Sequence, residues 1–184
     1  MTQPTPDHAP PADFAPQDET HRQMVHWLGN LDALVVRLEA EGWTPWARDT
    51  ARSVVDFFSQ AGRQHHADEE KLVFPLLVGR GNAELDAQVE RLQQDHGWIE
   101  ENWLELMSQL RPVAEGFTTY DADLLRQVSD VFTALLREHI ELEETSVYPA
   151  ARATLAQHRA GVAHRTGGGQ PVNPALAPEP FMPR

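Results

Sequence analysis

Two stretches of the chain repeat one pattern of residues that can bind metal. Residues 65–75 and 139–149 both read His-x3-Glu-Glu-x3-aromatic-Pro, without a gap. Residues four apart lie on one face of a helix, so His65 and Glu69 point the same way, as do His139 and Glu143. Two such imidazole–carboxylate pairs in one small helical protein are suitable ligands for a pair of metal ions.

Four helices are expected to position these residues. Apolar residues recur at helical spacing over about 18–41, 45–78, 83–110 and 121–156. The connections are short, and the longest is expected to be a loop over about 111–120. This order predicts an all-α fold, an antiparallel up-down-up-down four-helix bundle.

The apolar stripe of each helix predicts which side chains face the core. On regular helices the stripe includes Val25 in the first helix, Leu72 and Leu76 in the second, and Ser146 in the fourth. Pro75 is expected to kink the second helix. The aromatic residue before each repeated proline is expected to serve packing rather than binding.

Proline marks the ends of the helical domain. Ten of the fourteen prolines lie before residue 17 or after residue 170. We expect disordered tails over residues 1–17 and 158–184, and one bundle domain over 18–157.

Composition excludes several functions. The chain has no cysteine, which rules out disulfides, zinc–thiolate sites and thiol catalysis. Its formal net charge of −13 argues against nucleic acid and anionic membranes as partners. No apolar run has the length of a membrane span, and no signal-peptide pattern opens the chain, so we expect a cytoplasmic location.

One histidine from each helix is expected at the same height in the bundle. In an antiparallel pair, residues are level when they lie equally far from the turn that joins their helices. His65 and His96 each lie 15 residues from their turn, and His21 and His65 each lie 20 residues from theirs. For His96 and His139 the separations are 14 and 18 residues, a mismatch of about 6 Å at 1.5 Å per residue. We expect all four imidazoles to cluster.

A second pair in the first repeat leaves an alternative open. His66 and Glu70 are also four residues apart, but their face of the helix is not apolar, and the second repeat has isoleucine where His66 stands. We therefore prefer His65 and Glu69 as ligands, and whether His66 and Glu70 join the site stays open.

Buried carboxylates favour a metal site over a packed core. A single histidine on an apolar stripe is more often a hydrogen-bonded core residue than a ligand. Two carboxylates buried beside four histidines, however, cost several kcal/mol or must take up protons unless a partner compensates them. A bound cation removes this penalty. Mixed nitrogen and oxygen ligands suit iron, with manganese or zinc as alternatives.

The order of these residues resembles that of the hemerythrin-like, or HHE cation-binding, domain. Over residues 18–156 the chain carries His, His-x3-Glu, His and His-x3-Glu on successive helices, and the Glu-Glu-x3-Phe-Pro end of the first repeat is typical of bacterial members. The resemblance implies an oxygen-bridged di-iron centre whose ligands are His21, His65, Glu69, His96, His139 and Glu143. The two glutamates would be its bridging carboxylates.

Two departures from the oxygen-carrying hemerythrins bear on function. Those carriers have two histidines four apart on the third helix and His-x4-Asp on the last. Here Leu92 stands four residues before His96, and the last helix has His-x3-Glu. One metal therefore has fewer nitrogen ligands. Glu100 could add an oxygen, although a solvated face is its expected place. These departures argue against reversible oxygen carriage and leave open an unoccupied metal position.

The expected function is that of a non-heme di-iron protein that binds or senses oxygen, peroxide or nitric oxide at an open metal position. The alternatives are an oxidoreductase that consumes peroxide or nitric oxide, a protein that takes up iron or reports its level, and a plain helical interaction module. A binding protein is favoured over an enzyme because no separate proton-donor constellation is visible. The sequence indicates no particular protein partner.

Overall fold

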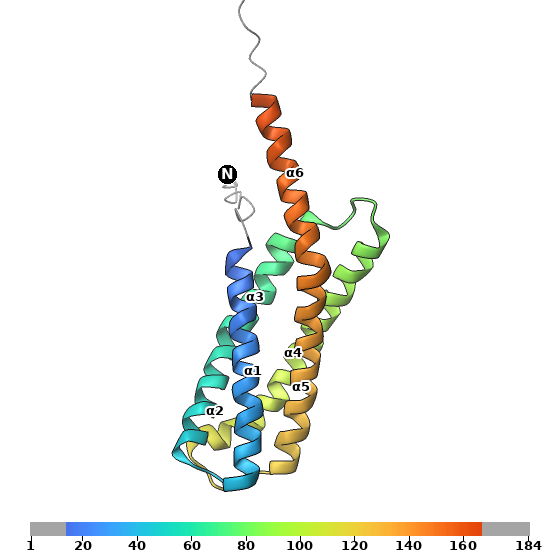
Figure 1. Cartoon of the computed structure of the whole chain (residues 1–184). Coiled ribbons are helices and arrows are strands. Elements are labelled where there is room, and N and C mark those ends of the chain that lie inside the picture. Colours follow the sequence, from blue (N-terminus) through green and yellow to red (C-terminus); the bar gives the residue numbers. More distant parts are fainter. Residues whose placement is uncertain (1–13, 167–184) are drawn as a thin grey trace, which may run out of the picture.

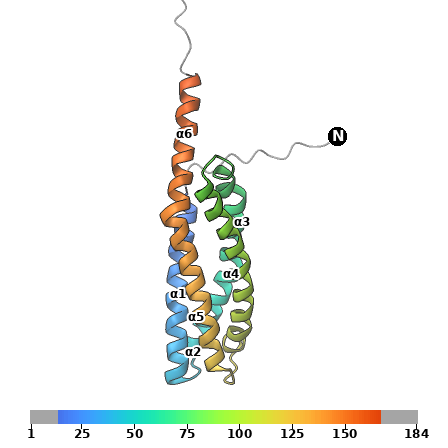
Figure 2. The ribbon, with the colours of Figure 1, turned by 90° about the vertical axis from the view of Figure 1, so that its right-hand side faces the viewer.

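Four long helical runs pack side by side in a computed structural model that describes residues 14–166, with side chains to residue 160. The runs alternate in direction, and both ends of the described chain lie at the same end of the bundle (Figures 1 and 2). The expected all-α antiparallel four-helix bundle is confirmed. Its helices are α1 (Ala15–Glu41), α2 (Pro45–Phe57), α3 (Arg63–Asp68), α4 (Ala83–Glu115), α5 (Ala122–Leu142) and α6 (Tyr148–Thr166).

Polar caps fix where three of the helices begin. Thr44, Asn82 and Asp121 each accept a hydrogen bond from the backbone N–H three residues on, at 3.1, 3.2 and 3.0 Å. At the far end of α4, Gly116 adopts a left-handed φ of 97° and terminates the helix. Helix α4 thus runs five residues past its expected end at 110, and the loop that follows is shorter than predicted.

Three wide turns of π-helical geometry interrupt the second and fourth runs. They span Phe58–Gly62, Glu69–Val73 and Glu143–Val147. The second run then closes with a 3-10 turn, Phe74–Leu76, at the proline where a kink is expected. A π turn holds one residue more than an α turn, so it rotates every later side chain around the helix axis.

This rotation corrects the predicted core. In the second run Val73 and Leu77 are buried, whereas Leu72 and Leu76, which a regular helix places inward, are only partly buried. The fourth run shows the same shift, with Val147 buried and Ser146 partly exposed.

The predicted ends of the outer helices also need correction. The last helix continues to Thr166 rather than ending near 156, so the first part of the segment expected as a tail is helical. Helix α6 extends beyond the other helices in Figures 1 and 2. In α1, Val25 is 43% exposed, contrary to its predicted inward place. The remaining parts of the two predicted tails, 1–13 and 167–184, lie outside the described residues.

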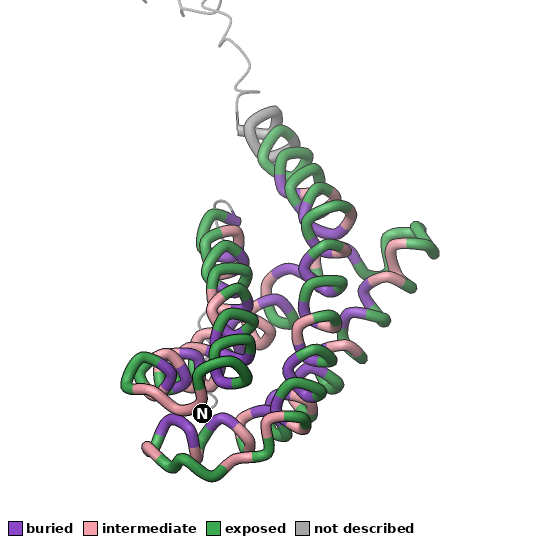
Figure 3. The backbone as a smooth tube through the Cα atoms, turned by 60° about the horizontal axis from the view of Figure 1, so that its bottom comes forward, coloured by how far each residue is buried: buried purple, intermediate pink, exposed green. Residues whose placement is uncertain are grey.

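The buried side chains form two apolar clusters, one toward each end of the bundle. The larger includes Leu28, Val54 and Trp103, and the smaller includes Phe14, Phe74 and Leu92. Figure 3 shows buried positions recurring along the helices. No helix between residues 14 and 166 is both long and apolar enough to cross a membrane.

Candidate metal centre

All six residues predicted as ligands lie in the core, between the two apolar clusters. Their exposed fractions range from 0 to 7%. The four helical runs each supply one of the predicted histidines, and the two carboxylates begin the π turns at Glu69 and Glu143. The structure therefore brings together every side chain that the sequence pattern selected.

His96 and His139 lie closer to the same height in the bundle than the sequence predicts. The ring centres of His96 and His139 lie 4.9 Å apart. Because α4 reaches Glu115 and α5 begins at Ala122, His96 lies 19 residues and His139 lies 17 residues from the ends that face their loop. The expected mismatch of four residues thus shrinks to two.

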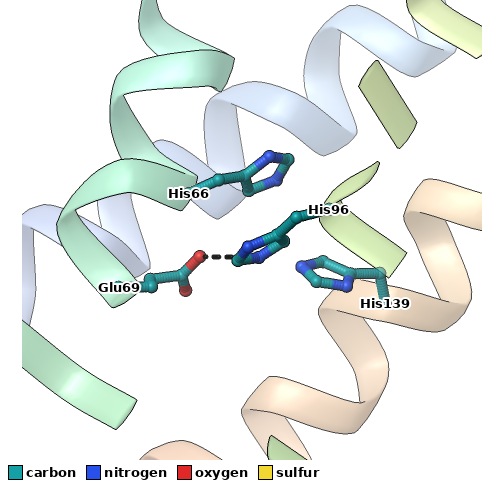
Figure 4. A group of neighbouring side chains, drawn as sticks. All are labelled: His66, Glu69, His96 and His139. Atoms are coloured by element: carbon teal, nitrogen blue, oxygen red, sulfur yellow. Dashed lines mark ion pairs between the residues drawn. The ribbon is translucent and has the colours of Figure 1, made fainter. Parts of the chain in front are cut away.

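The polar side chains form two groups of four that share Glu69, and Figure 4 shows the group that contains His66, His96 and His139. Within each group, one potential ligand atom from each residue lies within 4.8 Å of the others. The first group is His21, His65, Glu69 and Glu143. The second group is His66, Glu69, His96 and His139.

Glu69 reaches toward both groups. Its Oε1 lies 3.3 Å from His65 Nε2 in the first group, and its Oε2 lies 3.6 Å from His96 Nε2 in the second. A carboxylate with one oxygen on each side has the arrangement of a bridge between two cations.

Glu143 is placed in the same way from the opposite side. Its Oε2 lies 3.1 Å from His21 Nε2, and its Oε1 lies 3.2 Å from His139 Nε2. Both carboxylates therefore span the space between the two groups.

Many of these buried polar atoms have no hydrogen-bond partner within the described part of the chain. They include Nε2 of His65, His66, His96 and His139, Oε2 of Glu69, and both carboxylate oxygens of Glu143. Each unsatisfied buried group costs on the order of 1–3 kcal/mol. Cations at the two groups would satisfy these atoms together, so the residues present fit a pair of metal ions.

The second glutamate of each Glu-Glu pair orients a histidine on another helix. Glu70 Oε1 lies 2.9 Å from Nδ1 of His96, and Glu144 Oε1 lies 3.2 Å from Nδ1 of His21. A partner on Nδ1 fixes the ring and directs Nε2 toward the centre, which is how metal-binding histidines are usually held. The repeated Glu-Glu pattern thus has two functions in each copy.

The Tyr148 hydroxyl makes polar contacts that were not predicted from the sequence. Its ring stacks on His21 with centres 5.1 Å apart, and its hydroxyl lies 3.3 Å from His21 Nε2. The same hydroxyl donates a short hydrogen bond to Oε1 of Glu69. Tyr148 therefore holds a predicted ligand in place, in addition to the packing role expected for it.

The two carboxylates differ in their protonation. Burial, together with the nearby charge of Glu69, raises the pKa of Glu143 to about 8. Burial also acts to raise the pKa of Glu69, but its contacts with His96, His65 and His66 outweigh burial and lower that pKa. Without metal at pH 7, Glu69 is ionised and Glu143 holds a proton.

The pKa values of the buried histidines are shifted in different directions as well. Burial lowers the pKa of His65 to about 4, and burial also lowers the pKa of His66 well below its ordinary value. Burial opposes a charge on His21 too, but its interactions with Glu143, Glu69 and Glu144 together outweigh burial and raise its pKa. His65 and His66 are therefore neutral at pH 7, the form in which imidazole binds metal.

His66 belongs to the cluster, together with the preferred His65. Its ring stacks against that of His96 with centres 4.2 Å apart. A regular helix would turn two adjacent residues about 100° apart, but α3 is only six residues long and lies between two π turns. The sequence signal for this arrangement is that His65 and His66 are adjacent. The π turns on either side of them could not be predicted from the sequence.

Glu100 lies outside both groups. Its Oε1 is 3.1 Å from Arg63 Nη2, and its side chain is 33% exposed. It forms a surface ion pair rather than adding an oxygen to the second group.

Comparisons with known proteins agree with this geometry. The family model for the hemerythrin HHE cation binding domain matches residues 15–151, which include all seven residues of the two groups. An uncharacterized protein of Haemophilus influenzae is 27% identical over 124 residues, which cover 67% of this chain and 70% of that protein. No solved structure matches the chain.

Proposed function

The chain belongs to the hemerythrin HHE cation-binding domain family, and we propose that its two ligand groups hold two iron ions. The observation that carries this proposal is the pair of carboxylates, Glu69 and Glu143, each with one oxygen toward either group. Imidazole and carboxylate ligands together suit iron. Manganese and zinc are compatible with the same ligands, so the metal must be identified by analysis.

We further propose that the centre binds or senses oxygen, peroxide or nitric oxide. The first group offers four side chains and the second offers five when Glu143 is counted, fewer than the six ligands of an octahedral ion. Iron held here would supply electrons and an open position for such a molecule. The two apolar clusters on either side keep bulk water away from the site.

The surrounding residues have defined parts in this proposal. Glu70 and Glu144 hold the rings of His96 and His21, and the Tyr148 hydroxyl holds one oxygen of Glu69. These contacts set the ligand positions before any metal binds, so little rearrangement is needed when it does.

A second candidate is an oxidoreductase that consumes peroxide or nitric oxide. The buried Tyr148 hydroxyl supports it, because it places a hydrogen-bond donor next to the first group. Turnover by the iron-loaded protein should then exceed that of an equal concentration of free iron. Equal rates would leave binding or sensing as the function.

Elemental analysis and optical spectra test the main proposal. Protein purified without an affinity tag should contain about two irons per chain, and its absorption spectrum should change on addition of oxygen, peroxide or nitric oxide. Iron-loaded protein whose spectrum is unchanged by all three would contradict the proposed function.

A further inference from the structure

A small apolar cavity lies beside the second group. Its volume is about 20 Å³, which is room for a water-sized molecule. The apolar side chains that line it are themselves buried, with exposed fractions of at most 5%. They are Met24, Phe58, Ile99, Trp103, Phe132 and Leu136.

His66 connects this cavity to the candidate metal centre. It is both a lining residue and a member of the second group. Its Nε2 is buried and has no hydrogen-bond partner among the described residues. A molecule in the cavity would therefore lie next to the ligands of the second metal position.

An ion pair lies on the solvent side of the cavity. Arg63 and Glu100 also line it, and Arg63 Nη2 lies 3.1 Å from Glu100 Oε1. Their side chains are 62% and 33% exposed, unlike the apolar walls. Ion pairs this exposed are weak and exchange readily with water, so the contact can open without disturbing the bundle.

We infer that this cavity is the route by which a small uncharged diatomic molecule reaches the second group, and that the Arg63–Glu100 pair covers its mouth. The inference rests on the proposed function and adds a route and a ligand class to it. Apolar walls admit an uncharged diatomic at little cost in hydration, whereas an anion would lose its water without compensation. The molecule that enters by this route is therefore oxygen or nitric oxide, and a charged ligand such as azide must reach the centre by another path.

Gly62 offers a substitution that narrows the cavity and leaves the fold intact. It lines the cavity, and its φ of −60° is helical. A Cβ added there would lie 3.5 Å from Phe58 Cδ1 and 3.9 Å from Met24 Cε, which is ordinary contact. Gly29→Ala is a matched control, because Gly29 is an exposed helical glycine with nothing within 4 Å of an added Cβ.

Stopped-flow association of nitric oxide with the iron-loaded protein tests the route. Gly62→Ala should slow association severalfold, whereas Gly29→Ala should match the unchanged protein. Glu100→Gln removes the charge that holds Arg63 and should speed association. Azide binding should be insensitive to Gly62→Ala. Identical nitric oxide rates in all four proteins, or an equal slowing of azide, would overturn the inference.

Xenon binding gives a readout that does not depend on iron. Crystals under xenon pressure should show xenon in the cavity, against the side chains of Phe58, Ile99 and Trp103, and Gly62→Ala should lower its occupancy. Absence of xenon from the cavity would also overturn the inference. Failure of the proposed function would be distinct, because it would appear as loss of the spectral response while the xenon site remained.

Discussion

The two adjacent glutamates of each repeat have different roles. In each repeat the first glutamate lies in the centre, and the second contacts Nδ1 of a histidine on another helix, as Glu70 does for His96. The pattern His-x3-Glu-Glu therefore supplies both a proposed ligand and the hydrogen-bond partner of a proposed ligand on another helix. This accounts for a second acidic residue that a minimal binding motif would not need.

Replacing the supporting carboxylate should weaken metal binding without removing a ligand. In Glu70→Gln the ring of His96 loses a charged acceptor, so we expect metal affinity to fall by about 10–100-fold. Competition with a chelator measures this directly. Glu101→Gln, an exposed position on α4, is the control and should leave affinity unchanged. Equal affinities in both variants would refute the supporting role.

The role of the Tyr148 hydroxyl can be tested by removing its oxygen atom. Tyr148→Phe keeps the stacking on His21 but leaves the Glu69 carboxylate without its donor. We expect the metal-free protein to lose about 1.5–3 kcal/mol of unfolding free energy, the range for hydrogen bonds to charged groups. Chemical denaturation measures the loss. Tyr120→Phe, whose hydroxyl donates to the Leu38 carbonyl, is the neutral counterpart and should lose less.

Metal affinity should rise with pH. The pKa of Glu143 is raised to about 8, so at pH 7 this carboxyl holds a proton that a metal ion must displace, and the raised pKa of His21 acts in the same direction. Affinity should therefore increase from pH 6 to about 8 and then level off, and binding at pH 7 should release protons. Calorimetry in buffers of different ionisation enthalpy counts those protons. An affinity that is flat over this range would be inconsistent with a protonated Glu143.

At the residue scale, sequence spacing selected six side chains that lie together in the core, because regular helical geometry relates them. It found His65 and Glu69 by their separation of four, and His21 by its height. It did not place His66, because the face to which that residue belongs depends on π turns. It did not assign the Tyr148 hydroxyl either, because an aromatic residue before proline gives no sign of where its hydroxyl will point.

At the scale of elements, two of the three π turns begin at the central carboxylates. Glu69–Val73 and Glu143–Val147 stand at equivalent places in the two repeats. Each turn lets a carboxylate and the buried residues after it point into the core together. Such wide turns weaken a helix and occur frequently at functional sites.

Deleting one residue from a π turn should separate folding from binding. Removing the exposed Lys71 turns Glu69–Val73 into a regular α turn and leaves later residues such as Phe74 in phase. We expect the variant to fold with unchanged or higher metal-free stability but to bind metal more weakly. Thermal unfolding and chelator competition measure the two effects.

The comparison is deletion of Glu101 from the regular α4, which rotates Trp103 away from the core and should destabilise the fold. If the Lys71 deletion keeps full metal affinity, the π turn has no part in the site.

Element boundaries were predictable where caps mark them. Thr44, Asn82 and Asp121 identify helix starts to within a residue. The end of α4 was not predictable in the same way, because Pro112 resembles a stop signal although Gly116 is where the helix ends. The extension of the last helix to Thr166 agrees with a signal that the prediction did not use, because no proline interrupts residues 150–166 and Gly167-Gly168-Gly169 follows directly.

At the scale of the whole molecule, the bundle encloses a layer of polar side chains. Burying this layer opposes folding unless metal ions bind to it. Glu69 and Glu143 are fully buried, and the predicted histidines are at most 7% exposed. Ion binding to the folded state alone stabilises that state by mass action. Metal should therefore contribute to the stability of this fold and not only to its chemistry.

Metal removal should lower the melting temperature. Iron-loaded protein is expected to unfold at a higher temperature than the same protein treated with a chelator, because the unfolded chain lacks the assembled site. Differential scanning calorimetry measures the shift. His65→Ala should melt at one temperature with or without iron, whereas His26→Ala, at an exposed position, should keep the shift. Identical melting of loaded and metal-free protein would rule out this coupling.

The most direct measurement of the central claim is anomalous diffraction at the iron absorption edge from crystals of the iron-loaded protein. Two peaks should appear, one among His21, His65 and Glu143 and the other among His66, His96 and His139, with Glu69 between them. A single peak, or iron bound anywhere outside the two groups, would contradict the paired centre.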